Sequence, residues 1–259
     1  MLLRFVKYQG TGNDFVMIDD RNRFFDQHIN LIPNLCNRRM GIGADGLILI
    51  RNHTDLDFEM VYFNADGSQS MCGNGSRCAV NFAKALGMID RNETHFLSTD
   101  GPHMAVLLPN GEVELQLADV TQMTQYDEHE LFIDTGSPHH IRFVENLSAY
   151  DVYNEGRSIR QDTERYPQGT NVNFVEIAGD QSIHVRTFER GVEDETLSCG
   201  TGVTAASLAA SLKSMESPVT IHTPGGTLKV NYEKAEPHGF KNVFLTGPAE
   251  KVFDGQIEL

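Results

Sequence analysis

Met71-Cys72-Gly73-Asn74-Gly75 and Ser198-Cys199-Gly200-Thr201-Gly202 each place one cysteine directly before a Gly-x-Gly turn. An alanine-rich segment follows each turn, and the spacing of apolar residues predicts helices over 76–86 and 203–212. Backbone N–H groups and the dipole at a helix start favour an anion, including a thiolate. Two thiols in matching settings therefore predict an acid and a base that act on one substrate.

The match between the two cysteine turns extends to an internal repeat with an offset of about 125 residues. Four blocks keep their order and nearly their spacing, which is rare by chance. We therefore expect two homologous halves, residues 1–117 with Cys72 and residues 118–251 with Cys199, and a C-terminal strand, 252–259, that joins the first half. The matched blocks are Thr11–Val16 with Thr135–His140, Gly43–Ile48 with Gly169–Phe174, Phe63-Asn64 with Phe188-Glu189, and Cys72 with Cys199.

Most other apolar runs are short and bounded by Gly, Pro, Asn or Asp, which is typical of strands. The turn Pro109-Asn110-Gly111 predicts a hairpin between two of them. The expected helix over 203–212 has almost no polar face, which indicates that it is enclosed on most sides. These patterns predict a mixed, strand-rich α/β fold.

Composition excludes several classes of partner. The chain has 259 residues and a formal charge of −15, so neither nucleic acid nor an anionic membrane is expected to bind it. No apolar run is long enough for a membrane span. Four cysteines without a secretory signal predict a cytoplasmic protein with reduced thiols.

A pair of equivalent thiols suits inversion of a carbon that bears hydrogen, because one group removes the α-proton and the other delivers a proton to the opposite face. The N–H groups of Gly73, Asn74, Gly200 and Thr201 would hold the carboxylate at that carbon. A structural disulfide between the cysteines is disfavoured in a reducing compartment. The spacing of Cys72 and Cys78 does not suit zinc, and no basic residue follows the turns as a P-loop requires. We expect Cys36 and Cys78 to be core residues and no metal to be bound.

Five motifs are distributed over both halves of the chain: Gly10–Phe15, Asn64–Ser68, Met71–Cys78, Phe188–Gly191 and Cys199–Gly202. They resemble the diaminopimelate epimerase family, and the resemblance extends from Tyr8 to Gly247-Pro248-Ala249. The resemblance implies a cofactor-independent isomerase that converts LL-2,6-diaminopimelate to the meso form, on the route to lysine and cell-wall peptide. It also implies two pseudo-symmetric domains, each a barrel-like β-sheet wrapped round a central helix, with the active site in the cleft between them.

By this resemblance, Cys72 and Cys199 are the proton-transfer pair. Arg190 would pair with the distal carboxylate of the substrate and Glu189 with its ammonium. His139 would support the site by orienting or tuning the thiols. The remaining expected substrate-binding residues are Asn13, Asn64, Gly73, Asn74, Asn171, Gly200 and Thr201.

The chain departs from the family pattern at several positions. Ser137 stands where an asparagine is frequent, Gly46 where some members have glutamine, and Phe253 where a tyrosine has been linked to the contact of a homodimer. The resemblance still implies a homodimer. Alternative functions are a proline-type racemase, whose family typically has histidine at the position of Asn74, and a non-catalytic amino-acid binding protein. Phenazine-biosynthesis-like isomerases share the fold without the cysteine pair.

Overall fold

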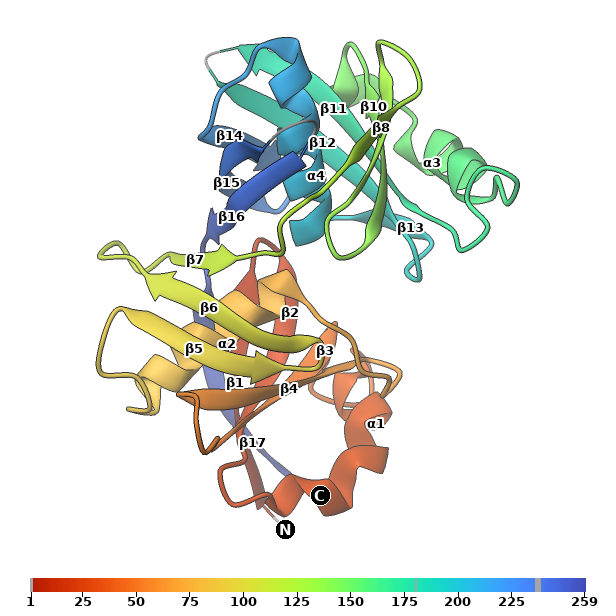
Figure 1. The fold of residues 1–259 in the computed structure, drawn as a ribbon. Coiled ribbons are helices and arrows are strands. Elements are labelled where there is room, and N and C mark those ends of the chain that lie inside the picture. The colour runs from red at the N-terminus through yellow and green to blue at the C-terminus, as the bar shows by residue number, and fades with distance from the viewer. Residues whose placement is uncertain (1, 180, 236–238) are drawn as a thin grey trace. The chain divides into compact units, whose positions relative to one another are not determined.

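The computed structural model describes residues 2–179, 181–235 and 239–259. The chain forms two compact units (Figure 1). Unit 1 consists of Met1–Leu115 and Gly247–Leu259, and unit 2 consists of Gln116–Thr246. The return of the C-terminal segment to unit 1 is a pairing of strand β17 (Glu250–Glu258) with strand β1 (Leu2–Gly10).

The sheet of unit 1 runs in the order β17, β1, β2, β3, β4, β5, β6, β7. The pairs β2–β3 and β4–β5 are parallel, and the other pairs are antiparallel. The expected hairpin at Pro109-Asn110-Gly111 is confirmed, because β6 and β7 pair across it. The further strands are β2 (Asn13–Asp19), β3 (Gly46–Arg51), β4 (Phe58–Asn64), β5 (Glu93–Ser98), β6 (Gly101–Leu107) and β7 (Val113–Gln116).

Unit 2 repeats this pattern with strands β8, β9, β10, β11, β12, β14, β15 and β16, and the short β13 pairs with the end of β12. The parallel pairs are β10–β11 and β12–β14. The strands are β8 (Met123–Gln125), β9 (Glu130–Asp134), β10 (Pro138–Phe143), β11 (Asn171–Gly179), β12 (Ser182–Glu189), β13 (Asp194–Thr196), β14 (Val219–Thr223), β15 (Gly226–Ala235) and β16 (Gly239–Gly247).

The two ladders correspond strand by strand, with the same alternation of parallel and antiparallel pairs. β17 pairs with β1 as β8 pairs with β9, although β17 reaches that place from the far end of the chain. Neither sheet closes into a barrel: over the described ranges no ladder joins β17 to β7 or β8 to β16. In unit 2, the segment before β8 contacts β16 through the isolated bridge between Val120 and Phe240. The strand-rich α/β class is confirmed, with open sheets.

One buried helix lies inside each sheet. In unit 1, α2 (Gly73–Ala85) contacts β1, β2, β3, β4 and β6, and in unit 2, α4 (Gly200–Ala210) contacts β9, β10, β11, β12, β14 and β15 (Figure 1). All of α4 except Thr201 is buried, as its apolar sequence predicts. Both helices begin three residues earlier than predicted, directly after the cysteines, because the Gly-x-Gly segments form their first turns.

The other helices cover the outside of the sheets. α3 (Val152–Arg160) packs on β11 and β12, and it approaches closely because Gly156 has no Cβ to collide with Phe188. In unit 1, the 3-10 helix η1 (Phe24–Leu31) leads into α1 (Ile32–Cys36). Two short 3-10 turns, η2 (Leu147–Ala149) and η3 (Ser211–Lys213), complete the helices. No helix in the described ranges is both long and apolar enough to cross a membrane.

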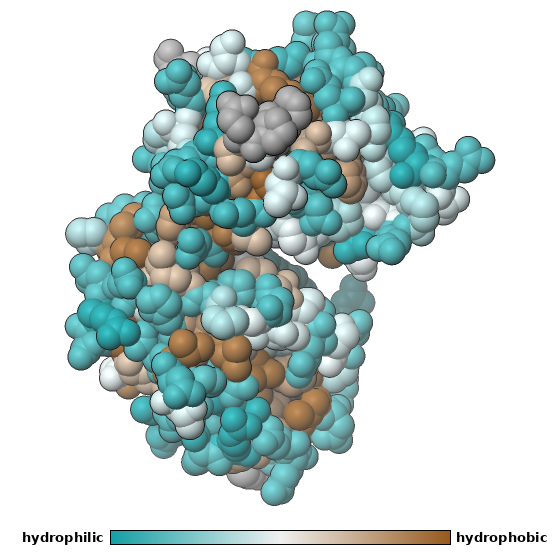
Figure 2. Space-filling model, viewed as in Figure 1, coloured by the Kyte–Doolittle hydropathy of each residue, from teal (hydrophilic) through white to brown (hydrophobic). Residues whose placement is uncertain are grey.

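Hydrophilic residues cover most of the visible face of each unit, with small separate hydrophobic patches between them (Figure 2). The apolar side chains instead form the interiors around α2 and α4 and under the outer helices. In unit 1, one such cluster contains Phe25, Ile32, Leu47 and Leu49. In unit 2, a cluster under α3 contains Val152, Phe174 and Phe188.

Candidate active site

Cys72 is the N-cap of α2, with extended backbone angles, and its sulfur accepts a hydrogen bond from the N–H of Gly75 at 3.4 Å. The first intrahelical bond runs from the N–H of Ser76 to the carbonyl of Cys72. The N–H groups of the first turn therefore have no acceptor inside the helix and point out of its start. This is the anion-binding arrangement that the Gly-x-Gly turn predicts.

The turn between β1 and β2 brings Asn13 to the sulfur of Cys72. Thr11 and Gly12 both have positive φ in this turn, a conformation that a glycine adopts without strain. The Asn13 amide nitrogen donates to the carboxylate of Asp45 at 2.6 Å, so its amide oxygen faces Cys72. The thiol of Cys72 donates to that oxygen over 3.6 Å. An amide oxygen only accepts hydrogen bonds, so this contact favours the protonated thiol.

The carboxylate of Asp45 is held in place by an ion-pair network of basic side chains. Arg38 bonds both Asp45 and Asp14, at 2.7 Å each, and Lys7 lies 2.8 Å from Asp14. Burial raises the pKa of the Asp14 carboxyl, but its hydrogen bonds with Arg38 and Lys7 outweigh that effect and hold the pKa well below its usual range. The network fixes the carboxylate that orients Asn13.

The side chain of Arg77 orients the side chain of Asn74. The guanidinium of Arg77 donates to the Asn74 amide oxygen at 2.9 Å, and the Asn74 amide nitrogen donates to Asn13 at 3.5 Å. Arg77 is fully buried, and its other hydrogen bonds go to Thr11 and to the carbonyls of Gly73 and Pro248. Burial lowers its pKa, and the neighbouring thiols of Cys78 and Cys72 act in the opposite direction.

The other predicted residue of unit 1, Asn64, ends β4. Its amide nitrogen donates to the hydroxyls of Ser68 and Ser70 at 3.0 and 3.2 Å. These contacts tie Asn64 to its own turn rather than to the group of Asn13, Cys72 and Asn74.

Cys199 is the N-cap of α4 and is 8% exposed. Its sulfur lies 3.6 Å from the hydroxyl of Thr201. The first helical bond, from the N–H of Val203 to the carbonyl of Cys199, matches the bond at Ser76 in unit 1. The hydroxyl of Thr135, the residue directly after β9, donates to the carbonyl of Thr201 at 2.9 Å and fixes the helix start there.

A buried chain of polar side chains leads away from Thr201. His139 Nε2 lies 2.9 Å from the Thr201 hydroxyl, and His139 Nδ1 lies 3.1 Å from the amide nitrogen of Asn173. Asn173 also contacts the carbonyl of His140 and the hydroxyl of Thr187. Burial, assisted by the charge of Arg190, lowers the pKa of His139 to about 3. His139 is therefore neutral at physiological pH.

The remaining predicted residues of unit 2 lie around Asn171. Its amide nitrogen donates to the Ser137 hydroxyl and the Pro138 carbonyl, at 2.8 and 3.0 Å, and its oxygen accepts from the N–H of Arg190 at 2.9 Å. Ser137, one of the departures from the family pattern, thus helps to support Asn171. The neighbouring Glu189 accepts a hydrogen bond from Thr196 at 2.7 Å.

The other two cysteines, Cys36 and Cys78, are not helix N-caps. Burial raises the pKa of Cys36 to about 11 and that of Cys78 to about 12. Both are buried core residues, as predicted, and both stay protonated near neutral pH. In the described ranges of the chain, no group of His, Cys, Asp and Glu side chains is arranged to hold a metal ion.

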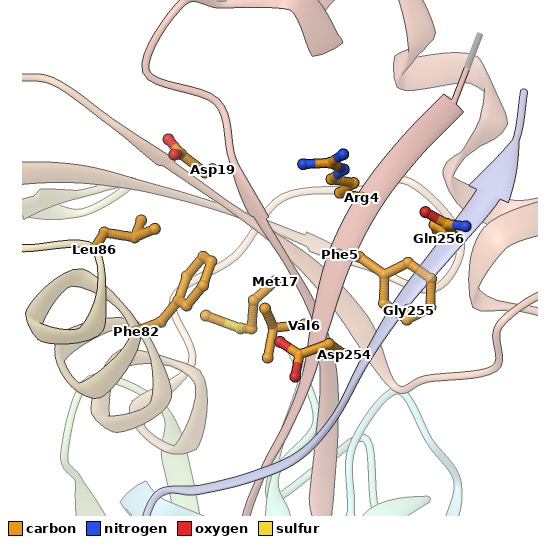
Figure 3. A pocket seen from close by; sticks show the side chains of 10 residues that line it. All are labelled: Arg4, Phe5, Val6, Met17, Asp19, Phe82, Leu86, Asp254, Gly255 and Gln256. Carbon is orange, nitrogen blue, oxygen red and sulfur yellow. The ribbon is translucent and has the colours of Figure 1, made fainter.

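A hollow of about 440 Å³ lies elsewhere in unit 1. Arg4, Phe5 and Val6 of β1 line it together with Phe82 and Leu86 near the end of α2 and residues 254–256 of β17 (Figure 3). None of the predicted site residues lines it. The residues that line this hollow include neither a cysteine nor a residue at the start of a helix, so we do not assign the hollow to the reaction.

Several contacting residues were not predicted from the sequence: Arg77, Asp45, Asn173 and Thr187. Asn173 could have been found, because it lies two residues after Asn171 in a buried strand and so on the same face. Asp45 stands inside a repeat block. Arg77 has no comparable signal, since a charged residue in an expected helix is normally solvated.

Comparison with known proteins identifies the family. The model of the family described as diaminopimelate epimerase matches residues 5–130 and 131–252. The diaminopimelate epimerase of Flavobacterium psychrophilum is 49% identical over 98% of this chain and 100% of its own length. That of Aquifex aeolicus is 40% identical, with 98% of each chain covered.

Solved structures with low sequence identity share the fold. A phenazine biosynthesis protein of the PhzF family from Bacillus anthracis matches with a TM-score of 0.81 at 12% identity, over 100% of both chains. A hydroxyproline epimerase from Agrobacterium vitis, with bound trans-4-hydroxy-L-proline, matches with a TM-score of 0.71 at 14% identity, over 100% of this chain and 93% of its own. With a family model that spans nearly the whole sequence and relatives that match from end to end, this chain belongs to the diaminopimelate epimerase family.

Proposed function

We propose that the chain interconverts LL- and meso-2,6-diaminopimelate by moving the proton at one α-carbon between two cysteines, without a cofactor. Family membership supports the substrate, since the relatives that match over the full length carry that name. The matched N-cap thiols support the mechanism. The meso product would supply lysine and cell-wall peptide synthesis.

The observation that carries the mechanism is the difference between the side chains that face the two thiols. The sulfur of Cys72 accepts from the N–H of Gly75, but the side chain that faces it presents the amide oxygen of Asn13, which only accepts, so we assign Cys72 as the thiol. Cys199 faces the hydroxyl of Thr201, which can donate to a thiolate. Cys199 is therefore the base that removes the α-proton in one direction, and Cys72 is the acid that delivers a proton to the other face. In the reverse reaction the roles exchange.

The substrate would be held at both ends. N–H groups at the starts of α2 and α4 would bind the carboxylate beside the reacting carbon, with Gly73, Asn74, Gly200 and Thr201 as donors. Arg190 would take the distal carboxylate and Glu189 the distal ammonium. Asn13, Asn64 and Asn171 would complete the site, and Asn171 positions the backbone of Arg190 through its own hydrogen bond.

The test is incubation of the reduced protein with LL-diaminopimelate in D₂O. We expect meso product that carries deuterium at the inverted α-carbon, detected by chiral chromatography and mass spectrometry. Activity should survive EDTA and hydroxylamine, which remove metals and pyridoxal phosphate. Replacing either Cys72 or Cys199 by Ser should lower kcat by about 10²-fold or more.

Two alternative functions give different outcomes in the same assay. A non-catalytic binding protein would leave the substrate undeuterated. A proline-type racemase, which the fold alone permits, would invert L-proline or trans-4-hydroxy-L-proline and not diaminopimelate. Either result would refute the proposal.

We also propose a cytoplasmic homodimer. Proton-transferring thiols need a reducing compartment. Val252 and Phe253 on β17, the end strand of the unit 1 sheet, are 55% and 46% exposed, so this strand offers apolar area to a second copy. Light scattering after size exclusion should give twice the mass of 28.9 kDa. Val252→Asp should yield monomer, whereas Leu212→Asp, an exposed change in unit 2, should not. A monomeric native protein at micromolar concentration would contradict this proposal.

A further inference from the structure

The hydrogen bonds that run from Asn173 through His139 and Thr201 to Cys199 all have the same donor-to-acceptor direction, and Asn173 determines it. The Asn173 amide nitrogen is 3.2 Å from the carbonyl of His140, which can only accept. Its oxygen is 2.9 Å from the hydroxyl of Thr187, which donates. Rotating the amide by 180° would place its oxygen against the His140 carbonyl oxygen, and two acceptors would then face each other without a proton. The amide nitrogen therefore faces His139.

The orientation of Asn173 decides the tautomer of His139. Because the amide nitrogen donates, His139 Nδ1 must accept and carry no proton. His139 is neutral, so its single ring proton lies on Nε2, which donates to the hydroxyl oxygen of Thr201 at 2.9 Å. The hydroxyl proton of Thr201 is then directed away from His139 and toward the sulfur of Cys199, 3.6 Å away.

Packing keeps this arrangement rigid. Asn173 and His139 are fully buried, and Thr187 is 3% exposed. The first turn of α4 passes directly over Asn173: a Cβ added at Gly202 would lie 2.3 Å from the Asn173 amide oxygen and 3.3 Å from the sulfur of Cys199. The absence of a side chain at Gly202 is thus what lets the helix start and Asn173 approach each other.

We propose that Asn173 is a positioning residue that fixes His139 in the Nε2–H tautomer and thereby directs the hydroxyl of Thr201 as a hydrogen-bond donor to the thiolate of Cys199. This inference rests on the proposed function, because it explains how Cys199 is kept ready as the base. Thr187 has a supporting role, since its hydroxyl holds the Asn173 amide oxygen.

The key variant is Asn173→Asp, which keeps the shape of the side chain but replaces the donor with an acceptor and adds a negative charge. The uncharged Thr187→Val variant below is the control for that charge. His139 should move its proton to Nδ1, and Nε2 should then accept from Thr201, so that the Thr201 hydroxyl no longer donates to Cys199. The tautomer is read by ¹⁵N NMR, because protonated and bare imidazole nitrogens differ widely in chemical shift. The His139 signals are assigned by their loss in His139→Asn.

The second measurement is the pH dependence of iodoacetamide alkylation, followed by mass spectrometry. Cys199 is measured in Cys72→Ser protein and Cys72 in Cys199→Ser protein, so each thiol serves as the control for the other. Asn173→Asp should raise the alkylation midpoint of Cys199 by about one to two pH units, which corresponds to loss of a hydrogen bond to a charged group. The midpoint of Cys72 should not move.

A further pair of variants covers the case in which Asn173→Asp does not fold. Thr187→Val should shift the Cys199 midpoint in the same direction by a smaller amount, and Thr187→Ser, which keeps the hydroxyl, should restore it. A purely structural role would lower thermal stability without changing the tautomer and without separating the two thiols.

The inference is overturned if native His139 carries its proton on Nδ1, or if the variants leave the tautomer and the Cys199 midpoint unchanged. Neither readout depends on turnover of diaminopimelate. A protein that shows the expected tautomer and shift but no epimerisation would refute the proposed function and leave the positioning role of Asn173 intact.

Discussion

The carboxylate of Asp45 holds the amide nitrogen of Asn13 at 2.6 Å. That contact determines which end of the Asn13 amide faces Cys72, and so whether the thiol or the thiolate is favoured there. The oxygen faces Cys72, which makes Asn13 an acceptor for the thiol proton. In unit 2, Asn173 has the corresponding role at a greater distance from the sulfur, because it acts through His139 and Thr201.

Replacing Asp45 by Asn should disturb the resting state of Cys72. An amide at position 45 can accept or donate, so Asn13 can turn over and present its N–H to the sulfur. We expect faster alkylation of Cys72 at pH 7 and a kcat lower by about tenfold, the effect of roughly one hydrogen bond to a charged group. Asp57→Asn, which removes a carboxylate bonded to Arg91 and Thr94 in the same unit, is the control. Equal effects of the two changes would contradict the role of Asp45.

Arg77 and Arg51 provide a contrast between two buried arginines of unit 1. Arg51 is 2.7 Å from the fully buried Asp20 and also contacts Asp26, whereas no carboxylate in the described ranges forms an ion pair with Arg77. Arg51→Met should cost about 3–5 kcal/mol of unfolding free energy, because it leaves a buried carboxylate unpaired. Arg77→Met should cost less, since burial of an unpaired cation is itself unfavourable.

For activity, we expect Arg77→Met to be more harmful than Arg51→Met, which is the reverse of the order expected for stability. Arg77→Met removes the group that orients Asn74 and the positive charge beneath Cys72, so we expect kcat to fall by tenfold or more, on the order of one charged hydrogen bond. Arg51→Met should retain kcat at a temperature where it is folded. Urea unfolding and steady-state kinetics test both statements. An Arg77→Met protein with native kcat would exclude a role for this charge in the reaction.

The sequence predicts the elements that depend on local pattern and on repetition. The cysteine turns, the helices after them, the hairpin at Asn110-Gly111 and the correspondence of the strand ladders all follow from spacing along the chain. The orientations of Asn13 and Asn173 do not, because they depend on Asp45 and on the His140 carbonyl, which adjacent strands bring near. The same limit explains Arg77, whose hydrogen-bond partners come from segments as distant as Pro248.

The glycines at the third position of the two turns should differ in their tolerance of a methyl group. A Cβ at Gly75 meets the flexible ends of Ile48 and Met60, at 3.0 and 3.4 Å, but a Cβ at Gly202 lies 2.3 Å from the Asn173 amide oxygen. Gly75→Ala should therefore cost little, since alanine favours the helix by up to about 1 kcal/mol. Gly202→Ala should lower the unfolding free energy by about 1–3 kcal/mol through overpacking. Thermal unfolding of both variants measures the loss of stability. Equal losses in the two variants would contradict the close approach at Gly202.

Acid should destabilise unit 2 through its two buried histidines. Burial lowers the pKa of His139 to about 3. Burial also lowers the pKa of His140, to about 4; the charge of Glu130 acts against this effect, and the charges of Arg165 and Arg142 add to it. An unfolded histidine has a pKa of about 6.5. Between that value and the folded values, the unfolded chain binds protons that the folded chain does not, so stability is present above about pH 6.5 and is lost as the pH falls.

Each histidine should therefore remove up to about 1.4 kcal/mol of unfolding free energy per pH unit below pH 6.5. Far-UV circular dichroism in urea at pH 5, 6 and 7 measures this, and it is the suitable probe because the chain has no tryptophan. His140→Asn, which keeps a polar partner for the Tyr166 hydroxyl 2.7 Å away, should flatten the dependence by about half. The window from pH 5 to 6.5 lies above the range in which carboxylates such as Asp14 take up protons in the unfolded chain, so the slope there reports on the histidines. Stability that stays constant over this window would mean that His139 and His140 titrate normally in the folded protein.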